Sequence, residues 1–465
     1  MSALPEGWAE TTLGELGTWS SGGTPSKSTP SFWEGTLPWV SPKDLKTDFV
    51  TDSIDHISEA GLEAAKLKLL PPGTLLFVVR GMILARAFPV ALTRVPVTTN
   101  QDIRALTPAA GIDSEYLFRA LQNEAHRILH SVKEATHGTL RLDSDQLQRW
   151  PILLAPLAEQ RRIVEKVEAL LASIDYARDR LGAGLRSIQK LRRSVIAKAC
   201  SGELTRSWAE VNISSETRPW LIKRLGDVFR VATGATPLRK NLAYYQNGDV
   251  PWVRSGAVNE STITLPDEYI TALAVKETNT KVFAAGTLLI AMYGEGATRG
   301  KVAELGIDAA TNQALAAIVF DHGNESLRPF LKLFLGNRYN QSREDSAGGV
   351  QPNLSLQIIR DIEITIPSAS EQAEILRRVN VLMHLLEAAE KRVTDALSAA
   401  DRLPATILSK AFAGRLVPTE AELARKEGRS YEAAPQLLER VRKTYVRVVR
   451  KSAAHNRKTQ QPTSS

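Results

Sequence analysis

Basic and aromatic side chains stand in turn-like segments in both halves of the chain, and their chemistry fits contact with DNA. Arginine can bridge O6 and N7 of guanine in the major groove, and lysine can neutralise phosphates. An isolated Lys or Arg is more often ordinary solvated surface, so each position also has that interpretation. The candidate DNA-binding residues are Lys27, Lys43, Arg80, Arg86, Arg239, Lys240, Arg254, Tyr293, Arg299 and Lys301. Trp39 and Trp252, by contrast, are typical of core anchors.

The sequence contains none of the motifs that would indicate catalysis by this chain. Residues 294–301 are glycine-rich and end in Lys301, but Val302 stands where a phosphate-binding loop needs Ser or Thr. There is no Asp/Asn-Pro-Pro-aromatic tetrapeptide, no Gly-x-Ser-x-Gly elbow and no His-Glu-x-x-His pair. One cysteine and seven scattered histidines give no metal-ligand spacing. We therefore expect a binding protein without a metal site, a cofactor or catalytic residues.

Charge and hydropathy narrow the class of protein further. The net charge is +8, but residues 421–465 alone hold 11 basic and 4 acidic side chains. Residues 1–156 hold 14 basic and 17 acidic side chains, so any DNA contact there must be local. No apolar run reaches the roughly 20 residues that span a bilayer, and no signal pattern opens the chain. We expect a cytoplasmic protein that has no membrane partner.

The candidate residues lie in two copies of one unit, because the chain repeats itself at an offset of 212 to 213 residues. Two copies imply a pseudo-two-fold molecule, which suits a ligand built from two parts. The matched pairs include Trp8 with Trp220, Thr24-Pro25 with Thr236-Pro237, Pro38-Trp39-Val40 with Pro251-Trp252-Val253, Gly73-Thr74-Leu75-Leu76 with Gly286-Thr287-Leu288-Leu289, Thr99-Asn100-Gln101 with Thr311-Asn312-Gln313, and Glu159-Gln160 with Glu371-Gln372.

Each copy divides into a globular part of mixed α/β type and a long helix. Short apolar runs that follow Gly-containing turns, such as 75–79 and 288–292, predict strands. A basic amphipathic helix is possible over 437–449. The predicted divisions are a first globular α+β domain at 1–156, a first long helix with its linker at 157–216, a second α+β domain at 217–366, a second long helix at 367–416, and a basic, partly disordered tail at 417–465.

Apolar residues recur at alternating four- and three-residue spacing in both helical segments, which predicts a coiled-coil seam. At about 1.5 Å per residue, some 40 residues make a rod of roughly 60 Å. Packing of each helix on its own domain is the alternative, but two matching seams favour mutual pairing. Antiparallel pairing is favoured because it relates the halves by a two-fold axis. The seam residues are Ile163, Val167, Leu170, Ile174, Leu181, Ile188, Ile375, Val379, Leu382, Leu386, Val393 and Ile407.

With these segments in order, the chain resembles the specificity subunit of type I restriction-modification systems over about residues 1–416. The resemblance depends on the succession of globular part, helix, globular part and helix. It depends also on four segments, which are Leu4-Pro5-Glu6-Gly7-Trp8, Gly81-Met82-Ile83-Leu84-Ala85, Thr99-Asn100-Gln101-Asp102 and Pro156-Leu157-Ala158-Glu159-Gln160-Arg161-Arg162-Ile163.

The resemblance implies a non-catalytic subunit that recognises DNA sequence. Residues 1–155 and 217–366 would then be target-recognition domains, each reading one half of a gapped site on double-stranded DNA. The paired helices would fix the gap and help dock two methyltransferase subunits. S-adenosylmethionine and ATP would be held by partners, namely the methyltransferase and the motor/endonuclease subunits. Two alternatives remain open at this point: a stand-alone DNA methyltransferase or nuclease, and a coiled-coil scaffold that binds only protein.

Overall fold

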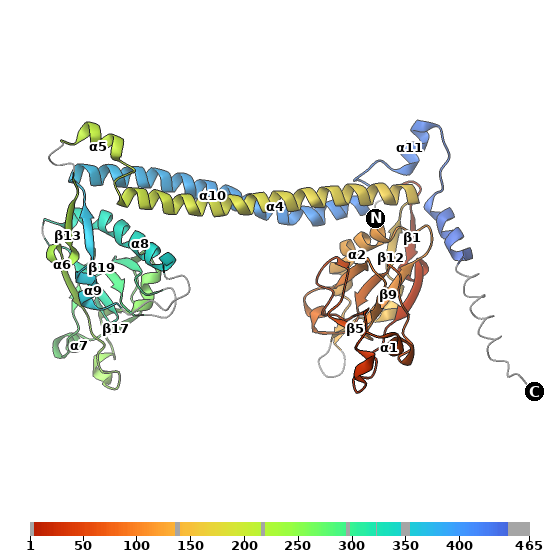
Figure 1. Ribbon diagram of the computed structural model, residues 1–465, viewed down its shortest axis with the longest axis horizontal. Coiled ribbons are helices and arrows are strands. Elements are labelled where there is room, and N and C mark those ends of the chain that lie inside the picture. The colour runs from red at the N-terminus through yellow and green to blue at the C-terminus, as the bar shows by residue number, and fades with distance from the viewer. Residues whose placement is uncertain are drawn as a thin grey trace, which may run out of the picture. The chain divides into compact units, whose positions relative to one another are not determined.

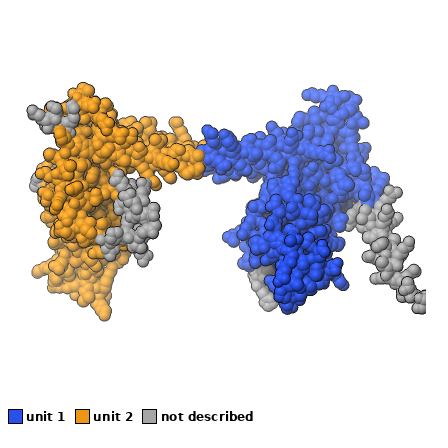
Figure 2. All heavy atoms as spheres, viewed as in Figure 1, with its two compact units in different colours: residues 1–180, 396–465 blue, residues 181–395 orange. Residues whose placement is uncertain are grey.

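The computed structural model describes residues 4–134, 140–214, 219–293, 298–321, 323–345 and 354–444. The chain forms two compact units, shown in blue and orange in Figure 2. Unit 1 combines residues 1–180 with residues 396–465, whereas unit 2 consists of residues 181–395. Unit 1 is therefore assembled from two distant stretches of sequence, and unit 2 from one.

Unit 1 is built on a five-stranded sheet in the order β2-β9-β6-β7-β4 and a three-stranded sheet in the order β5-β3-β8. Strand β6 is buried along its whole length because it is central and covered on both faces. The strands are β1 (Ala9–Thr12), β2 (Gly17–Ser21), β3 (Leu37–Val40), β4 (Phe49–Val50), β5 (Asp55–Ile57), β6 (Leu75–Val78), β7 (Val90–Thr93), β8 (Thr98–Thr99), β9 (Ile103–Pro108), β10 (Lys133–Glu134), β11 (Leu140–Arg141) and β12 (Pro151–Leu154).

Unit 2 repeats this topology, with a five-stranded sheet in the order β14-β22-β19-β20-β16 and a four-stranded sheet in the order β17-β15-β21-β18. In each unit the first strand pairs antiparallel with the strand that precedes the unit's own long helix. These pairs are β1 with β12 in unit 1 and β13 with β23 in unit 2. The strands are β13 (Leu221–Arg224), β14 (Arg230–Thr233), β15 (Val250–Val253), β16 (Thr262–Ile263), β17 (Glu268–Ile270), β18 (Val282–Phe283), β19 (Leu288–Ala291), β20 (Val302–Leu305), β21 (Ala309–Thr311), β22 (Leu315–Val319) and β23 (Glu363–Ile366).

One amphipathic helix packs on the five-stranded sheet of each unit, α2 against β7 and α8 against β20. The α-helices are α1 (Glu59–Ala64), α2 (Ser114–Leu129), α3 (Ser144–Gln148), α4 (Leu157–Cys200), α5 (Arg206–Asn212), α6 (Leu225–Val228), α7 (Ala272–Glu277), α8 (Arg328–Asp345), α9 (Leu356–Arg360), α10 (Ala369–Phe412) and α11 (Glu420–Glu427). A further helix covers residues 434–444.

The two long helices, α4 and α10, have 44 residues each and run side by side in opposite directions within each unit (Figure 1). In unit 1, Arg178 of α4 pairs with Asp401 of α10 at 3.0 Å. In unit 2, Arg192 of α4 pairs with Glu390 of α10 at 2.7 Å. As the position along α4 rises, its partner along α10 falls, which is an antiparallel pair. The predicted fold class, two α+β domains joined by an antiparallel helix pair, is confirmed.

Both long helices stop at a glycine in the left-handed conformation. Gly202 has φ +77° and Gly414 has φ +66°, a backbone geometry that ends a helix and that glycine adopts without strain. The N–H groups of Leu204 and Arg415 then donate to the carbonyls of Lys198 and Lys410 in the last helical turns. Each of the twelve seam residues is buried or half-buried in the structure. The helix continues through Pro404.

The helix of residues 434–444 is docked into unit 1. Leu437, Leu438 and Val441 lie in the same apolar cluster as Trp8 and the residues of α2. The Ala434 N–H donates to the Gly7 carbonyl at 2.8 Å. The sequence predicts a helix over 437–449. The structure places its start at residue 434 and buries its apolar face, while residues 445–449 lie outside the described residues.

Candidate nucleic-acid interface

In unit 1 the loops that carry the predicted cations meet at one edge of the five-stranded sheet. Val78 at the end of β6 pairs with Ile103 at the start of β9, and Ser21 at the end of β2 pairs with Arg104. The loops after β2, after β6 and before β9 therefore share an edge. The end of β3 joins them because the Asn100 N–H donates to the Val40 carbonyl at 2.9 Å. Topology thus brings together the loops that contain Lys27, Lys43, Arg80 and Arg86.

These four cations in unit 1 are all exposed. Arg80 and Arg86 flank a short 3-10 helix, η3 (Met82–Ala85), in which the side chain of Met82 is 66% exposed. Among the described residues, none of these four cations has an ion pair. An exposed apolar side chain between two unpaired arginines can pack on a base or sugar while the arginines contact phosphates.

Unit 2 brings the corresponding loops together in the same way. Ala291 at the end of β19 pairs with Leu315 of β22, and the Asn312 N–H donates to the Val253 carbonyl at 3.1 Å. Thr233 at the end of β14 pairs with Ala316 of β22, so the loops after β14, β15 and β19 share one edge of the sheet. They carry the remaining candidates, which are Arg239, Lys240, Arg254, Tyr293, Arg299 and Lys301.

In unit 2 several candidate cations are already engaged inside the protein. Arg239 lies over the rings of Tyr245 and Trp252 and forms a 2.6 Å ion pair with Glu268, a bond that raises the pKa of Arg239. Arg254 lies 3.6 Å from Asp267. These contacts orient the guanidinium groups but reduce the positive charge that they offer to DNA.

The other unit 2 candidates differ in how accessible they are. Lys240 is exposed, and the Tyr293 side chain is 43% exposed. Lys301 donates from Nζ to Asn259 Oδ1 at 2.7 Å, and Arg299 is half-buried. Residues 294–297, the glycine-rich part of this segment, lie outside the described residues. Among the described candidates, unit 2 therefore adds one exposed aromatic side chain, Tyr293, and holds Arg239, Arg254 and Lys301 in contacts with its own residues.

A matched tryptophan–glutamate contact holds the base of each unit. In unit 1 the indole Nε1 of Trp8 donates to Glu159 Oε1 at 2.9 Å, and the backbone N–H of Glu420 donates to Glu159 Oε2 at 2.8 Å. Burial is the main reason that the pKa of the Glu159 carboxyl is raised. Glu159 lies in the first turn of α4, where a negative charge interacts favourably with the helix dipole.

Unit 2 forms the same contact with a different third partner. Trp220 Nε1 donates to Glu371 Oε2 at 2.9 Å, and the Thr205 hydroxyl donates to Glu371 Oε1 at 2.8 Å. Trp220 and Glu371 lie 212 residues after Trp8 and Glu159. In both units the third donor follows the end of the other long helix. The repeat revealed these residues as matched positions, but the sequence analysis assigned them no role.

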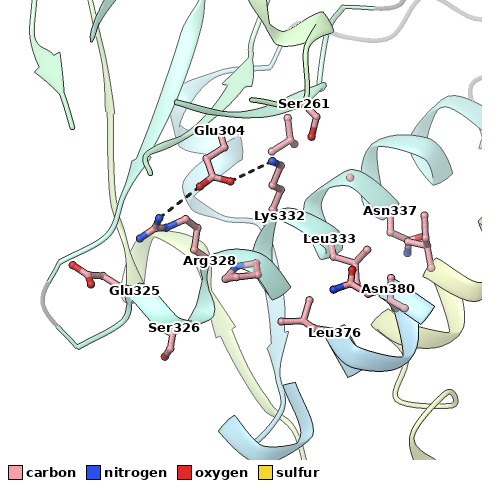
Figure 3. Close-up of a pocket in the computed structure, with 15 residues that line it drawn as sticks. Ser261, Glu304, Glu325, Ser326, Arg328, Lys332, Leu333, Asn337, Leu376 and Asn380 are labelled. Atoms are coloured by element: carbon pink, nitrogen blue, oxygen red, sulfur yellow. Dashed lines mark hydrogen bonds and ion pairs between the residues drawn. The ribbon is translucent and has the colours of Figure 1, made fainter. Parts of the chain in front are cut away.

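A cavity of about 900 Å³ opens in unit 2 between α8, α10 and strand β20 (Figure 3). On one wall, Glu304 accepts from Lys332 at 3.2 Å and lies 3.6 Å from Arg328. Asn380 of α10 and Leu333 of α8 line the opposite side. No sequence pattern singled out this cavity.

In the described parts of the chain, no three His, Cys, Asp or Glu side chains are grouped to hold a metal ion. In those same parts, no helix is both long and apolar enough to cross a membrane.

Comparison with known proteins identifies the family. The model of the type I restriction modification DNA specificity domain matches residues 5–181 and again residues 217–397. Because the two matches cover most of the sequence, the chain belongs to this family. The resemblance inferred from the sequence is thereby confirmed.

Curated relatives agree with this membership. The specificity subunit of the type I restriction enzyme EcoR124I/EcoR124II from Escherichia coli is 39% identical over 167 residues, 35% of this chain and 41% of that one. The MjaIX specificity subunit from Methanocaldococcus jannaschii is 24% identical over 318 residues, 64% of this chain and 69% of that one. The chain thus aligns with less than half of the first relative and about two thirds of the second.

Solved structures support the fold. The HsdS subunit from Thermoanaerobacter tengcongensis superposes with a TM-score of 0.59 at 20% identity, covering 89% of this chain and 98% of that one. A chain from a structure of the assembly of the type I R-M system gives a TM-score of 0.64 at 19% identity, covering 89% of this chain and all of that one. At this level of identity the likeness concerns the fold alone.

Proposed function

We propose that this protein is the DNA-recognition subunit of a type I restriction-modification complex and reads a bipartite, gapped target on double-stranded DNA. One observation carries the proposal. The same cluster of loops stands at the same sheet edge in each of two repeated units, while the exposed side chains in the loops differ. A shared scaffold with different side chains is what two different half-sites require.

The proposal assigns no chemical step to this chain. S-adenosylmethionine would be bound by methyltransferase subunits and ATP by a motor/endonuclease subunit, which leaves recognition to this one. The family membership supports that division of labour, whereas the two alternatives, an independent methyltransferase or nuclease and a protein-only scaffold, gain no support from the relatives. Work on cellular DNA would place the protein in the cytoplasm.

The long helices are the proposed docking surfaces for two methyltransferase subunits. Tyr176 and Leu403 in unit 1 are 65% and 45% exposed, and Leu191 and Leu385 in unit 2 are 54% and 63% exposed. Large apolar side chains on a helix surface are typical of a protein interface. We expect Tyr176→Glu to weaken one docking event and Leu385→Glu the other, measured as the number of methyltransferase subunits that co-purify.

The decisive test is a genome-wide map of methylated adenines after co-expression with a methyltransferase subunit that the protein binds. A single gapped motif is expected. Replacing residues 1–155 by the equivalent part of a relative should change one half of the motif and leave the other half intact. A continuous motif, or no motif while the complex assembles, would contradict the proposal.

A further inference from the structure

We propose that Gln101 and Gln313 are specificity-determining residues that read the same base pair, an A·T pair, in the two halves of the target. This inference rests on the proposed function and adds a common feature to both half-sites. It goes beyond the basic loops because glutamine carries no charge and can distinguish bases rather than only attract phosphates.

Each glutamine is held by the same hydrogen bond. The Thr24 hydroxyl donates to Gln101 Oε1 at 2.5 Å, and the Thr236 hydroxyl donates to Gln313 Oε1 at 2.6 Å. All four side chains are at the exposed edge of their unit. In both pairs the amide oxygen faces the threonine hydroxyl, and Nε2 is the other end of the amide. Among the described residues, neither Nε2 donates a hydrogen bond, so the amide nitrogen of each exposed glutamine is available to donate to a ligand.

The loop behind each threonine is rigid. A Cβ atom at Gly22 would overlap the Thr99 carbonyl, and one at Gly234 would overlap the Thr311 carbonyl, so the loop lies directly on the strand before each glutamine. The indole Nε1 of Trp39 donates to the Gly23 carbonyl at 2.9 Å. In unit 2, Trp252 makes the corresponding bond to the Ala235 carbonyl at 3.3 Å.

The backbone around each glutamine is fixed as well. Asn100 Oδ1 accepts from the Asp102 N–H at 3.0 Å, and Asn312 Oδ1 accepts from the Ala314 N–H at 3.2 Å. Each glutamine is therefore the middle residue of a turn in which the asparagine side chain before it bonds the backbone N–H of the residue after it. A pre-organised side chain loses little entropy on binding, which suits a specific contact.

Each glutamine stands where the basic loops converge. Gln101 lies between the end of β8 and the start of β9, the point at which the loops of Lys27, Lys43 and Arg80 meet. Gln313 holds the same place between β21 and β22 in unit 2. The surrounding cations differ between the units, whereas the Thr–Gln pair does not. The variable residues therefore suit the bases that differ, and the invariant pair suits a base that both halves share.

The free atoms of the amide match adenine among the four bases. Oε1 keeps a second lone pair that can accept from adenine N6, and Nε2 can donate to adenine N7. Guanine presents two acceptors in the major groove, and one of them would repel Oε1. Cytosine presents only a donor, so Nε2 would have no partner there. The two half-sites should therefore share an A·T pair at equivalent positions with respect to the pseudo-two-fold axis.

The test compares methylation maps of the complex that carries wild-type protein, Gln101→Ala or Gln313→Ala. We expect Gln101→Ala to relax one A·T position in one half-site and Gln313→Ala to relax one in the other, each with about 5- to 150-fold lower discrimination. Gln101→Glu, which retains the acceptor for Thr24 but loses the donor, should shift that position toward C·G. Gln357→Ala, an exposed glutamine that bonds Asp361 instead, is the matched control.

A second measurement separates base reading from a purely structural role. Replacing adenine by 7-deazaadenine at the assigned position removes only the bond to N7, and should weaken binding by wild-type complex about 2- to 13-fold and leave the Gln101→Ala complex unaffected. Uniform weakening across all sequences would mean a phosphate contact and would overturn the inference, as would an unchanged motif in both variants. Failure of the proposed function is distinct, because wild-type protein would then give no gapped motif.

Discussion

The two units share a topology, yet their sheet-packed helices meet the long helices in different ways. In unit 1, Arg119 of α2 is 5% exposed, and its guanidinium donates to Asp48 at 2.8 Å and to Glu168 of α4 at 2.7 Å. One buried arginine thus ties the sheet, the covering helix and the long helix together.

Unit 2 has the cavity of Figure 3 in the corresponding place. The match follows from the sheets, since the Leu92 N–H donates to the Asp48 carbonyl as the Glu304 N–H does to the Ser261 carbonyl. Ser261 therefore stands for Asp48. Leu333 is the sixth residue of α8, as Arg119 is of α2, and so corresponds to Arg119. Asn380 lies 212 residues after Glu168 and corresponds to it.

An aromatic contact near this junction is exchanged as well. Phe49 and Phe118 pack with ring centroids 5.9 Å apart in unit 1. At the matched positions in unit 2, Lys332 Nζ lies 3.4 Å from the Thr262 hydroxyl. A duplicated sequence thus preserves the strand order but not the side chains that join the parts. The helix α8 relies instead on a small apolar cluster with α10 that includes Phe330, Ile375 and Val379.

The largest effect is expected from a substitution in the helix of residues 434–444, which covers part of the core of unit 1. Leu437→Ala should destabilise unit 1 by about 3 kcal/mol, because it removes a fully buried side chain from the shared core. Hydrogen exchange read by mass spectrometry should show faster opening in unit 1 peptides only. Val211→Ala, on the exposed α5 of unit 2, is the control and should change nothing measurable.

Arg119→Leu would make unit 1 resemble unit 2 at the junction. We expect a loss of about 2–3 kcal/mol in the opening free energy of α2, because a buried guanidinium loses two charged hydrogen bonds. The check is hydrogen exchange of α2 peptides. Arg127→Leu on the same helix, 67% exposed and paired with Glu124, should cost less than about 1 kcal/mol. Equal losses in the two variants would refute the bridging role.

Acid should act on unit 1 through the carboxyl of Glu420, the residue whose backbone N–H donates to Glu159. Burial pushes the pKa of Glu420 upward, but bonds from Arg429 and Arg162 outweigh it and lower the pKa below its usual 4.5. Because the folded-state pKa lies below the unfolded value, this contribution is present above about pH 4.5 and is lost as pH falls through the folded-state pKa.

The measurement is the pH dependence of unit 1 opening. Glu420→Gln should flatten its acid limb and cost about 1.5–2 kcal/mol at neutral pH, since Arg162 and Arg429 lose a charged partner. In unit 2 the residue in the equivalent place is Thr205, which has no carboxyl to titrate, and the variant should leave the acid response of unit 2 unchanged. An unaltered acid limb in unit 1 would assign the pH response to other groups.

The smallest effect should come from building the missing bridge in unit 2. The triple variant Leu333→Arg, Ser261→Asp and Asn380→Glu should slow hydrogen exchange in α8. The opening free energy of α8 should rise by no more than about 1 kcal/mol. The gain is small because Lys332 and Arg328 would repel the new guanidinium. Faster exchange in α8 would show that the cavity is incompatible with the bridge that unit 1 uses.

Periodic features were predictable from the sequence. The long helices follow from the heptad spacing, which is local information, and their antiparallel pairing follows from the two-fold relation that the repeat implies. The state of the loop cations was not predictable. The sequence predicts Arg239 and Arg254 as DNA-binding cations. Their acidic partners, Glu268 and Asp267, come close only because β15 pairs with β17.

Contacts between distant segments account for the rest. The sequence indicates an amphipathic helix in the basic C-terminal tail, but it does not reveal that the face with Leu437 and Val441 packs into the core of unit 1. The bond from Trp8 to Glu159 joins residues 151 positions apart, and spacing alone gives no partner at such a distance. The cavity of unit 2 likewise depends on substitutions at three separate elements.

The discontinuous make-up of unit 1 has a consequence for the order of events on the ribosome. Unit 2 is a single stretch, residues 181–395, and all of its parts emerge together. Unit 1 begins emerging first but needs the Glu420 N–H for Glu159 and Leu437 for its core, which emerge last. Since a domain folds as a unit once its parts are available, the half that is synthesised first is completed last.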